Sequence, residues 1–266
     1  MSIPNLLPLK TILLDMDGVL WRSYEPIIDI KALFDKIQEL GCQAFCITNN
    51  STSTIEGYLH RLRKFGVELS PGQIITSAEA TASFLDEHLS KSDTVYVIGE
   101  DGLKETITGH GFKICDQPET DHPGAVVVGL DFKIDYQKIY LAANHIREGA
   151  LFIGTNPDKT FPMPGGIAPG AGSIISPVET ASGNSPIMIG KPEKYMYELA
   201  LTRSGSLPEE SLMIGDRIDT DIQGAQRLGI RTGLVLTGIS TREHLEDCEQ
   251  KPDLVGETAL DLVGYL

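Results

Sequence analysis

The sequence predicts an α/β fold, in which a parallel sheet carries helices and a second, smaller α/β unit is inserted into the first. Short apolar runs alternate with longer stretches of helical periodicity, which is the pattern of repeated βαβ units. Many of these runs end in glycine or in a group of polar residues, as strands that open into loops do. With 266 residues, the chain can bury a core in one large or two smaller domains.

The first unit begins with a strand, a helix and a second strand. Residues 12–14 form an apolar run, which predicts a strand buried on both faces. Residues 29–40 carry apolar side chains at helical spacing up to Gly41, and residues 43–47 predict the next strand. Because the crossover is helical, the two strands are expected to be parallel.

The remaining elements follow the same alternation. We expect strands at 74–76, 95–98, 125–129, 151–156, 186–190, 212–215 and 232–236, and helices at 53–65, 77–89, 103–109, 136–147, from 173, from 192, 219–228 and 258–266. Since the pattern restarts near residue 94, we predict that residues 1–79 and 184–266 form one domain and residues 80–183 an inserted one. The prolines and glycines between 155 and 173 predict an irregular loop.

The composition is that of a globular protein with an acidic balance. There are 37 Asp and Glu against 22 Lys and Arg, a net charge of −15, which argues against a nucleic-acid partner. The four cysteines lack metal-site or redox spacing, so we expect reduced thiols in a cytoplasmic protein. No apolar run is long enough for a membrane span, and none in residues 1–10 suits a signal peptide.

Two acids, Asp15 and Asp17, come directly after the first strand. Ligands of open α/β sheets bind at the carboxyl ends of the strands, where these acids lie. Extended backbone would point both carboxylates to one side, and Gly18 allows a sharp turn after them. When two carboxyl groups lie so close together, one is favoured as ionised and the other as protonated, unless a cation lies between them. The alternative is a solvated Asp-Gly turn that closes the strand.

Other polar groups follow further strands that we expect at the same edge. Thr48, Asn49 and Asn50 follow the second strand, where a helix N-cap would account for them equally well. Lys191 follows the run at 186–190, and a solvated lysine is its ordinary interpretation. The run at 212–215 is followed by Asp216, Asp219 and Asp221. Of this segment, Asp219 or Thr220 is expected to cap a helix. The joint occurrence of these groups predicts an active site.

This order resembles the haloacid dehalogenase-like (HAD) superfamily of phosphohydrolases. The resemblance is closest to the NagD and para-nitrophenyl phosphatase branch, which has a large α/β (type IIA) cap. It rests on Asp-Met-Asp-Gly-Val-Leu-Trp from Asp15, Thr-Asn-Asn-Ser from Thr48, Gly-Lys-Pro around Lys191 and Gly-Asp-Arg-Ile-Asp-Thr-Asp from Gly215. It implies a Rossmann-like parallel-sheet core at 1–79 and 184–266, with the cap at 80–183.

The resemblance also implies a role for each matched acid. Asp15 would be the nucleophile that forms an aspartyl phosphate, and Asp17 would be general acid and then general base. Mg²⁺ is the implied cofactor, held by Asp15, the backbone carbonyl of Asp17 and Asp216. Asp221 would complete the surroundings of the metal.

The remaining matched residues would bind the phosphorylated substrate. Thr48 and Asn49, with Asn50 beside them, would contact the phosphoryl group, and Lys191 would offset its charge. The loop from Asp158 to Pro164 would select the substrate. Some relatives that act on a pyridoxal phosphate cofactor have a histidine where this chain has Phe161, which disfavours that substrate. Phe161 either lines an apolar wall for a sugar or base or packs within the cap.

The predicted function is hydrolysis of a small phosphorylated metabolite such as a sugar phosphate, a nucleoside monophosphate, a phosphoglycolate-like ester or para-nitrophenyl phosphate. The alternative is a phosphoacceptor or binding protein on the same scaffold, without turnover. A signalling receiver domain is about half as long and has no role for Asp17, and a dehalogenase needs neither Asp17 nor Asp216. A homodimer is compatible with the sequence, because cap surfaces can pair without an obvious signature.

Overall fold

The computed structural model describes residues 8–23, 25–163 and 165–266. Residues 1–7, on which the expectation of no signal peptide largely rests, and Pro164 of the predicted substrate loop lie outside the described residues. The chain forms two compact units. The first contains the residues up to Thr48, Tyr58–Ile75 and Met196–Leu266, and the second contains Asn49–Gly57 and Thr76–Tyr195. The naming of these units as catalytic core and cap stays a prediction.

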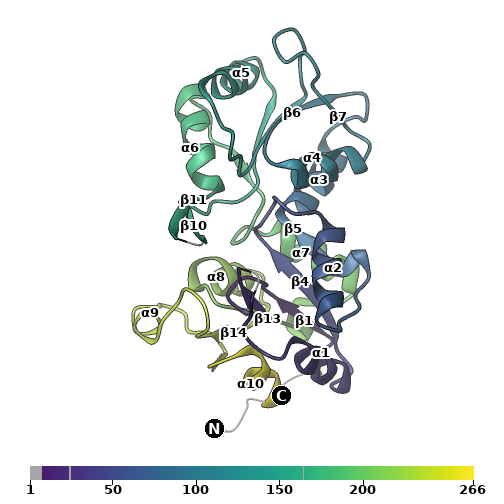
Figure 1. The fold of residues 1–266 in the computed structure, drawn as a ribbon, viewed down its shortest axis with the longest axis vertical. Helices are drawn as coiled ribbons and strands as arrows, with labels where there is room; N and C mark the ends of the chain where they lie inside the picture. The colour runs from purple at the N-terminus through teal and green to yellow at the C-terminus, as the bar shows by residue number, and fades with distance from the viewer. Residues whose placement is uncertain (1–7, 24, 164) are drawn as a thin grey trace. The chain divides into compact units, whose positions relative to one another are not determined.

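The first unit is built on a six-stranded sheet, and the β1–β4, β1–β13, β13–β14 and β14–β15 pairs are parallel (Figure 1). The strand order is β15 (Leu254–Gly256), β14 (Arg231–Val235), β13 (Ser211–Gly215), β1 (Thr11–Leu14), β4 (Gln43–Thr48) and β5 (Ile74–Thr76). All residues of β1 and β13 are buried, as expected for central strands of a sheet covered on both faces. The predicted α/β fold class is therefore confirmed.

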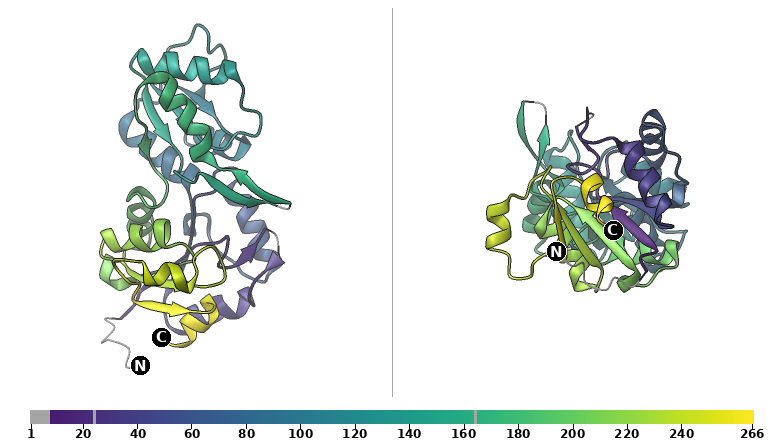
Figure 2. Two further views of the ribbon diagram at one scale, coloured as in Figure 1. Left: turned by 90° about the vertical axis from the view of Figure 1, so that its left-hand side faces the viewer. Right: turned by 90° about the horizontal axis from the view of Figure 1, so that it is seen from below.

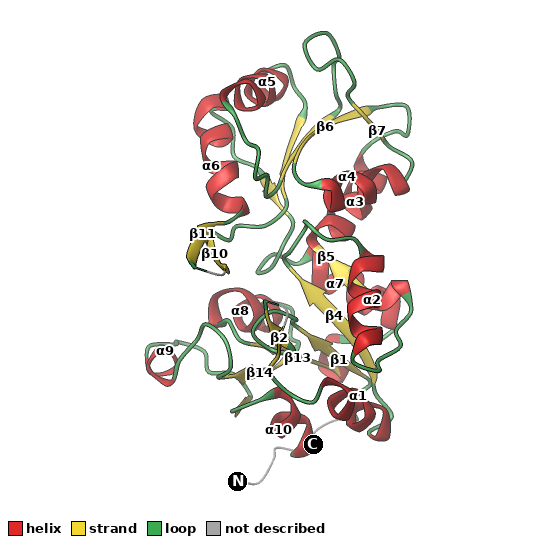
Figure 3. Cartoon of the chain, viewed as in Figure 1, coloured by secondary structure: helices red, strands yellow, loops and turns green. Residues whose placement is uncertain are grey.

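Helices and short elements complete this part of the chain (Figure 3). They are α1 (Ile30–Glu39), α2 (Ile55–Lys64), α7 (Tyr195–Ser204), α8 (Gln223–Arg227), α9 (Arg242–Glu246) and α10 (Ala259–Gly264), with the antiparallel pair β2 (Trp21–Arg22) and β3 (Glu25–Pro26). The N-cap of α1 is Asp29, whose carboxylate accepts from the Ala32 N–H, and its buried face packs Ile30, Leu33 and Ile37 into the unit. Helix α1 also packs against α10.

The second unit has a five-stranded parallel sheet of its own. Its strand order is β12 (Ile187–Met188), β9 (Leu151–Gly154), β8 (Ala125–Val128), β6 (Thr94–Ile98) and β7 (Lys113–Ile114). Helices α3 (Ser77–His88) and α4 (Asp101–Gly109) lie on one side of it, and α5 (Tyr136–Arg147) and α6 (Ala171–Ser182) on the other (Figure 1). An apolar core that includes Val126, Phe152 and Ile175 fills the space under α5 and α6.

The expectation of an irregular loop between residues 155 and 173 is wrong for the middle of that segment. Strands β10 (Thr160–Met163) and β11 (Gly166–Pro169) form an antiparallel hairpin, which projects from the second unit (Figure 2). The sequence predicts a loop here because proline disfavours central strands. A two-stranded hairpin tolerates Pro162 and Pro169, because an N–H that faces away from the partner strand makes no ladder bond.

The expectation that a fourth strand of the Asp15 sheet presents Lys191 is also wrong. Strand β12, which precedes Lys191, pairs with β9 in the sheet of the second unit, with Ile187 opposite Ile153. A short apolar run predicts a strand, but its sheet depends on tertiary packing that a single sequence does not encode locally.

Two smaller expectations need correction as well. Neither Asp219 nor Thr220 is a helix N-cap, because both lie inside a π-helical turn, η3 (Ile218–Ile222), that leads into α8. The sequence also favours residues 232–236 as the strand that closes the sheet, but β15 pairs beyond β14 and forms that edge. All four cysteines are free, as predicted. Within the part of the chain that the structure describes, no helix combines the length and the apolar character of a membrane span.

Candidate active site

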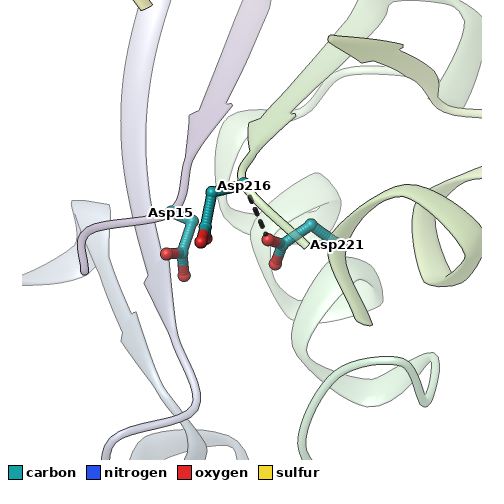
Figure 4. Close-up of side chains that lie close together, drawn as sticks. All are labelled: Asp15, Asp216 and Asp221. Carbon is teal, nitrogen blue, oxygen red and sulfur yellow. Dashed lines mark hydrogen bonds between the residues drawn. The ribbon is translucent and has the colours of Figure 1, made fainter. Parts of the chain in front are cut away.

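Three carboxylates converge at the carboxyl ends of two neighbouring strands of the first unit (Figure 4). Asp15, Asp216 and Asp221 are all buried, and one oxygen of each lies within 4.8 Å of those of the other two. Asp15 follows β1 and Asp216 follows β13, and the two strands pair in register, with Leu14 opposite Ile214. The register explains why Asp15 and Asp216, which are far apart in the sequence, meet.

Asp221 reaches this cluster from the π-helical turn η3. Its Oδ2 accepts from the main-chain N–H groups of Asp216, at 3.2 Å, and Arg217, at 3.1 Å, and Figure 4 shows the first of these bonds. The arginine next to Asp216 pairs with the exposed carboxylate of Asp219 instead, with Nη2 to Oδ2 at 2.8 Å. Asp219, the middle acid of the motif, is therefore not part of the carboxylate cluster.

A loop that the sequence motifs do not include fixes Asp216. The Ile239 N–H donates to Oδ2 of Asp216 at 2.7 Å, and the Ser240 N–H donates to its carbonyl at 3.0 Å. The Ser240 hydroxyl in turn accepts from the Ile218 N–H at 3.0 Å. A Cβ atom on Gly238 would overlap the Asp216 carboxylate, so only glycine fits there. A signal for this loop was present in the sequence as the Thr-Gly-Ile-Ser segment that begins two residues after β14 ends.

The turn after Asp17 approaches Asp216 from the other side. Gly18 has a φ of +90°, and a Cβ atom on it would lie 2.6 Å from Oδ2 of Asp216. Its carbonyl accepts from the Thr237 hydroxyl at 2.6 Å, and its N–H donates to the Trp21 carbonyl at 2.8 Å. The predicted sharp turn at Gly18 is confirmed.

The two acids of the first motif lie in different environments. Asp15 is 7 % exposed, and its N–H donates to the Ile214 carbonyl at 2.9 Å. Asp17 is exposed, and its carboxylate is not part of the three-carboxylate cluster. An exposed acid can exchange protons with solvent and a leaving group, whereas the buried one is held in place. The metal contact predicted for the Asp17 carbonyl stays a prediction.

Cys46 of β4 lies next to the nucleophile candidate. Burial raises the pKa of the Cys46 thiol, and the nearby Asp15 carboxylate raises it further. Cys46 therefore stays a neutral thiol beside Asp15, and does not add a thiolate to the carboxylate cluster.

The carboxylate cluster fits a hard divalent cation. Three buried carboxylates this close repel one another strongly unless a cation offsets their charge. The donor set is all oxygen, which suits Mg²⁺ and does not favour metals that prefer sulfur or imidazole ligands. Asp15, Asp216 and Asp221 are thus the residues that would hold the predicted ion.

The predicted phosphate-binding residues separate into different roles. Thr48 is buried at the end of β4. The Asn50 side-chain carbonyl oxygen accepts from both the N–H and the hydroxyl of Thr52, at 2.8 Å each, so this side chain shapes its own turn. Asn49 contacts Lys191 and Asp158 within the second unit. The prediction that all these residues bind the phosphoryl group stays a prediction.

Lys191, predicted as a core residue, lies in the second unit together with the two candidate cap residues Asp158 and Phe161. Lys191 is 2 % exposed, and not the solvated lysine of the alternative interpretation. Asp158 lies in the segment before β10, and Phe161 lies in β10 itself. The Phe161 ring packs against Phe132, with 6.5 Å between the ring centroids in an edge-to-face arrangement.

Comparison with known proteins identifies the family of this chain. A family model described as haloacid dehalogenase-like hydrolase matches residues 12–113, and a second, HAD-hydrolase-like model matches residues 188–262. An acid sugar phosphatase of Staphylococcus aureus is 38 % identical over 243 residues, which cover 91 % of this chain and 92 % of that protein. The chain belongs to the haloacid dehalogenase-like hydrolases.

Solved structures support the same assignment over nearly the whole length. A p-nitrophenyl phosphatase from Archaeoglobus fulgidus has a TM-score of 0.90 and 34 % identity, with 98 % of this chain and 100 % of that chain covered. NagD from E. coli K-12 has a TM-score of 0.86 and 28 % identity, with 96 % and 98 % covered. The predicted family, its NagD-type branch and the assignment as an HAD-type phosphatase are confirmed.

Proposed function

We propose that this chain is a Mg²⁺-dependent phosphomonoesterase that acts through an aspartyl phosphate on Asp15. The single observation that carries the proposal is the cluster of three buried carboxylates at the end of β1 and β13. A cation site beside a held carboxylate is what the attack of one anion on another requires. The phosphatase relatives support the same reaction class.

The proposed reaction has two steps. An oxygen of Asp15 attacks phosphorus, so that a new P–O bond forms while the ester P–O bond breaks, and Asp17 gives its proton to the departing alkoxide. Asp17 then accepts a proton from water, which attacks the same phosphorus and releases inorganic phosphate and Asp15. A bound Mg²⁺ would supply charge neutralisation during both steps.

Several groups of the chain would assist these steps. The Ile239 N–H and the η3 turn hold Asp216 and Asp221, so the carboxylates keep their spacing through the cycle. Thr48 would donate to the phosphoryl group, and Lys191 would offset its charge, as in the family pattern. The exposure of Asp17 suits a group that must reload its proton from solvent between catalytic cycles.

We propose a sugar phosphate as the natural substrate class, with para-nitrophenyl phosphate as an artificial one. The proposal is supported by the names of two relatives, an acid sugar phosphatase and a p-nitrophenyl phosphatase. The Phe161 and Phe132 rings on the hairpin side of the second unit would provide an apolar face for the alcohol part of the ester. The predicted cytoplasmic location and homodimer remain proposals that accompany this one, the first supported by four free cysteines.

The test is phosphate release from a panel of phosphomonoesters. Wild type, Asp15→Asn and Asp35→Asn are compared with Mg²⁺ and with a chelator. Asp35 is an exposed acid paired with Lys31 on α1, so its variant controls for the loss of one carboxylate. Mg²⁺-dependent release that only Asp15→Asn abolishes supports the proposal. No release from any ester by the wild type would favour a phosphoacceptor or binding protein.

A further inference from the structure

The Asn49 side chain makes a two-point contact with the main chain of Lys191. Its Oδ1 accepts from the Lys191 N–H at 2.8 Å, and its Nδ2 donates to the Lys191 carbonyl at 3.0 Å. Nδ2 also donates to Oδ2 of Asp158 at 3.0 Å. Since the first partner is a donor and the other two are acceptors, these neighbours fix which way the amide points.

These contacts use both hydrogens of the amide nitrogen. A phosphoryl oxygen is an acceptor, so Asn49 could donate to it only by releasing Lys191 or Asp158. Releasing either partner would leave the carbonyl of the buried Lys191 or the half-buried Asp158 carboxylate without this hydrogen bond, which is unfavourable. The geometry therefore disfavours the direct phosphate contact that the sequence suggested for this side chain.

The main chain of Asn49 belongs to the same network. Its carbonyl accepts from the Ser77 hydroxyl at 2.6 Å and from Nδ2 of Asn156 at 2.8 Å. The Asn156 side chain also accepts from the Asp158 N–H at 3.2 Å. Asn156 and Lys191 are 5 % and 2 % exposed. A buried network with its members hydrogen-bonded in this way holds one arrangement of the segments that it joins.

We propose that Asn49 is a positioning residue, which fixes the main chain of Lys191 and the carboxylate of Asp158 in one arrangement and does not itself bind the phosphoryl group. The proposal deepens the proposed function and rests on it, because Lys191 is there the group that offsets phosphoryl charge. It also assigns Asp158 a place in the network, as the acceptor that holds the amide in position.

The experiment exchanges the two side chains. In Asn49→Asp, a carboxylate faces Asp158 and the Lys191 carbonyl, so both contacts become repulsive. Adding Asp158→Asn returns a donor opposite the carboxylate now at position 49 and restores the 49–158 hydrogen bond with its direction reversed. We measure kcat and KM for para-nitrophenyl phosphate in both single variants, the double variant and wild type. Asn144→Asp is the matched control, because the hydrogen bond of Asn144 to Arg147 uses its acceptor oxygen, which the variant keeps.

We expect Asn49→Asp to lower kcat by about 100-fold, the effect of a misplaced catalytic group. The double variant should regain at least about tenfold of that loss, since the 49–158 contact is restored. A phosphate-binding Asn49 predicts the opposite, because the double variant still has a carboxylate where the phosphate would bind. A double variant no better than Asn49→Asp would overturn the proposal.

A second measurement separates positioning from phosphate binding. In Asn49→Ala, kcat should fall while inhibition by inorganic phosphate changes by less than about threefold. A loss of phosphate inhibition as large as the loss of kcat would contradict the proposal.

Failure of the proposed function itself would be visible separately. If wild type hydrolyses no ester, thermal unfolding of the four proteins of the exchange decides the matter. The double variant should then have a Tm closer to wild type than Asn49→Asp has. Additive changes in Tm would show that the two side chains are not coupled, and would overturn the inference independently of activity.

Discussion

The main-chain N–H of Ile239 donates to Oδ2 of Asp216 over 2.7 Å, and Gly238 is the residue that brings it there. This contact orients the carboxylate of Asp216, one of the three acids of the candidate metal site. The hydrogen bond can form because residue 238 is a glycine, since a Cβ atom at this position would overlap the Asp216 carboxylate.

Gly238→Ala should therefore raise the Mg²⁺ concentration needed for half-maximal activity by about 10- to 100-fold, as losses around metal ligands do. The measurement is the Mg²⁺ dependence of para-nitrophenyl phosphate hydrolysis. Gly72→Ala is the matched control, because a Cβ atom there meets nothing within 4 Å. An unchanged Mg²⁺ requirement in folded Gly238→Ala would refute the role of this contact.

Metal removal should be visible without turnover. Trp21 is the single tryptophan, it is fully buried, and its carbonyl accepts from the Gly18 N–H in the turn after Asp17. Binding of Mg²⁺ at Asp15 and Asp216 should fix this turn and change the Trp21 fluorescence with a saturable dependence that a chelator reverses. Asp216→Asn should weaken the apparent affinity by more than about tenfold. A fluorescence signal indifferent to Mg²⁺ in the wild type would argue against the site.

Stability of the second unit should depend on the protonation of His110. Its Nδ1 lies 2.8 Å from Asp86 Oδ2 and its Nε2 lies 3.3 Å from Glu79 Oε2, so both nitrogens face carboxylates and favour the doubly protonated ring. The hydrogen bond to Glu79 raises the pKa of His110 most, burial opposes this, and the hydrogen bond to Asp86 raises the pKa further. Because the pKa is raised in the folded state, the stabilisation is complete below the unfolded value of about 6.5 and is lost as the pH rises through the folded pKa.

His110→Gln should accordingly lower Tm more at pH 5.5 than at pH 9, by about 2–4 °C for each kcal/mol of lost stability. The check is thermal unfolding of both proteins across this range. His122→Gln is the control, because the His122 side chain is 86 % exposed and its contact with Glu148 is long, with 3.6 Å between Nδ1 and Oε2. Equal losses at the two pH values would show that the charge of His110 does not contribute.

The aromatic pair on the second unit should affect substrate preference. Phe161→Ala removes the ring that packs against Phe132, an interaction of about 0.5–1.5 kcal/mol. We expect KM for para-nitrophenyl phosphate to rise by about 2- to 10-fold relative to a sugar phosphate. Phe132→Ala tests whether the effect depends on the pair. A preserved ratio of the two KM values would mean that Phe161 only packs within its unit.

The sequence predicted those elements whose periodicity is strong and local. Helix α5 was predicted at 136–147, and it forms over Tyr136–Arg147, because its apolar spacing and the Asp135 cap agree. The three residues of β15 and the two of β7 were missed, since so short a run has no detectable period. The hairpin β10–β11 was missed because its prolines are unusual in strands.

The site was predictable where a motif follows a strand, and not where backbone groups form it. Asp15, Asp216 and Asp221 were found because acids directly after buried strands are conspicuous. The N–H of Ile239 carries no side-chain signal, and Asn49 is indistinguishable in sequence from a phosphate ligand. Their roles are set by contacts between segments far apart along the chain.

The pairing of β12 with β9 also determines how this enzyme can be recombined with its relatives. A chimera that exchanges only residues 80–183 would separate β9 from β12 and so divide one sheet between two parents. It would also separate Asn156 and Asp158 from Asn49. An exchange of Asn49–Gly57 together with Thr76–Tyr195 keeps the sheet, Lys191 and the Asn49 network from a single parent. Transplanted specificity should therefore follow these boundaries.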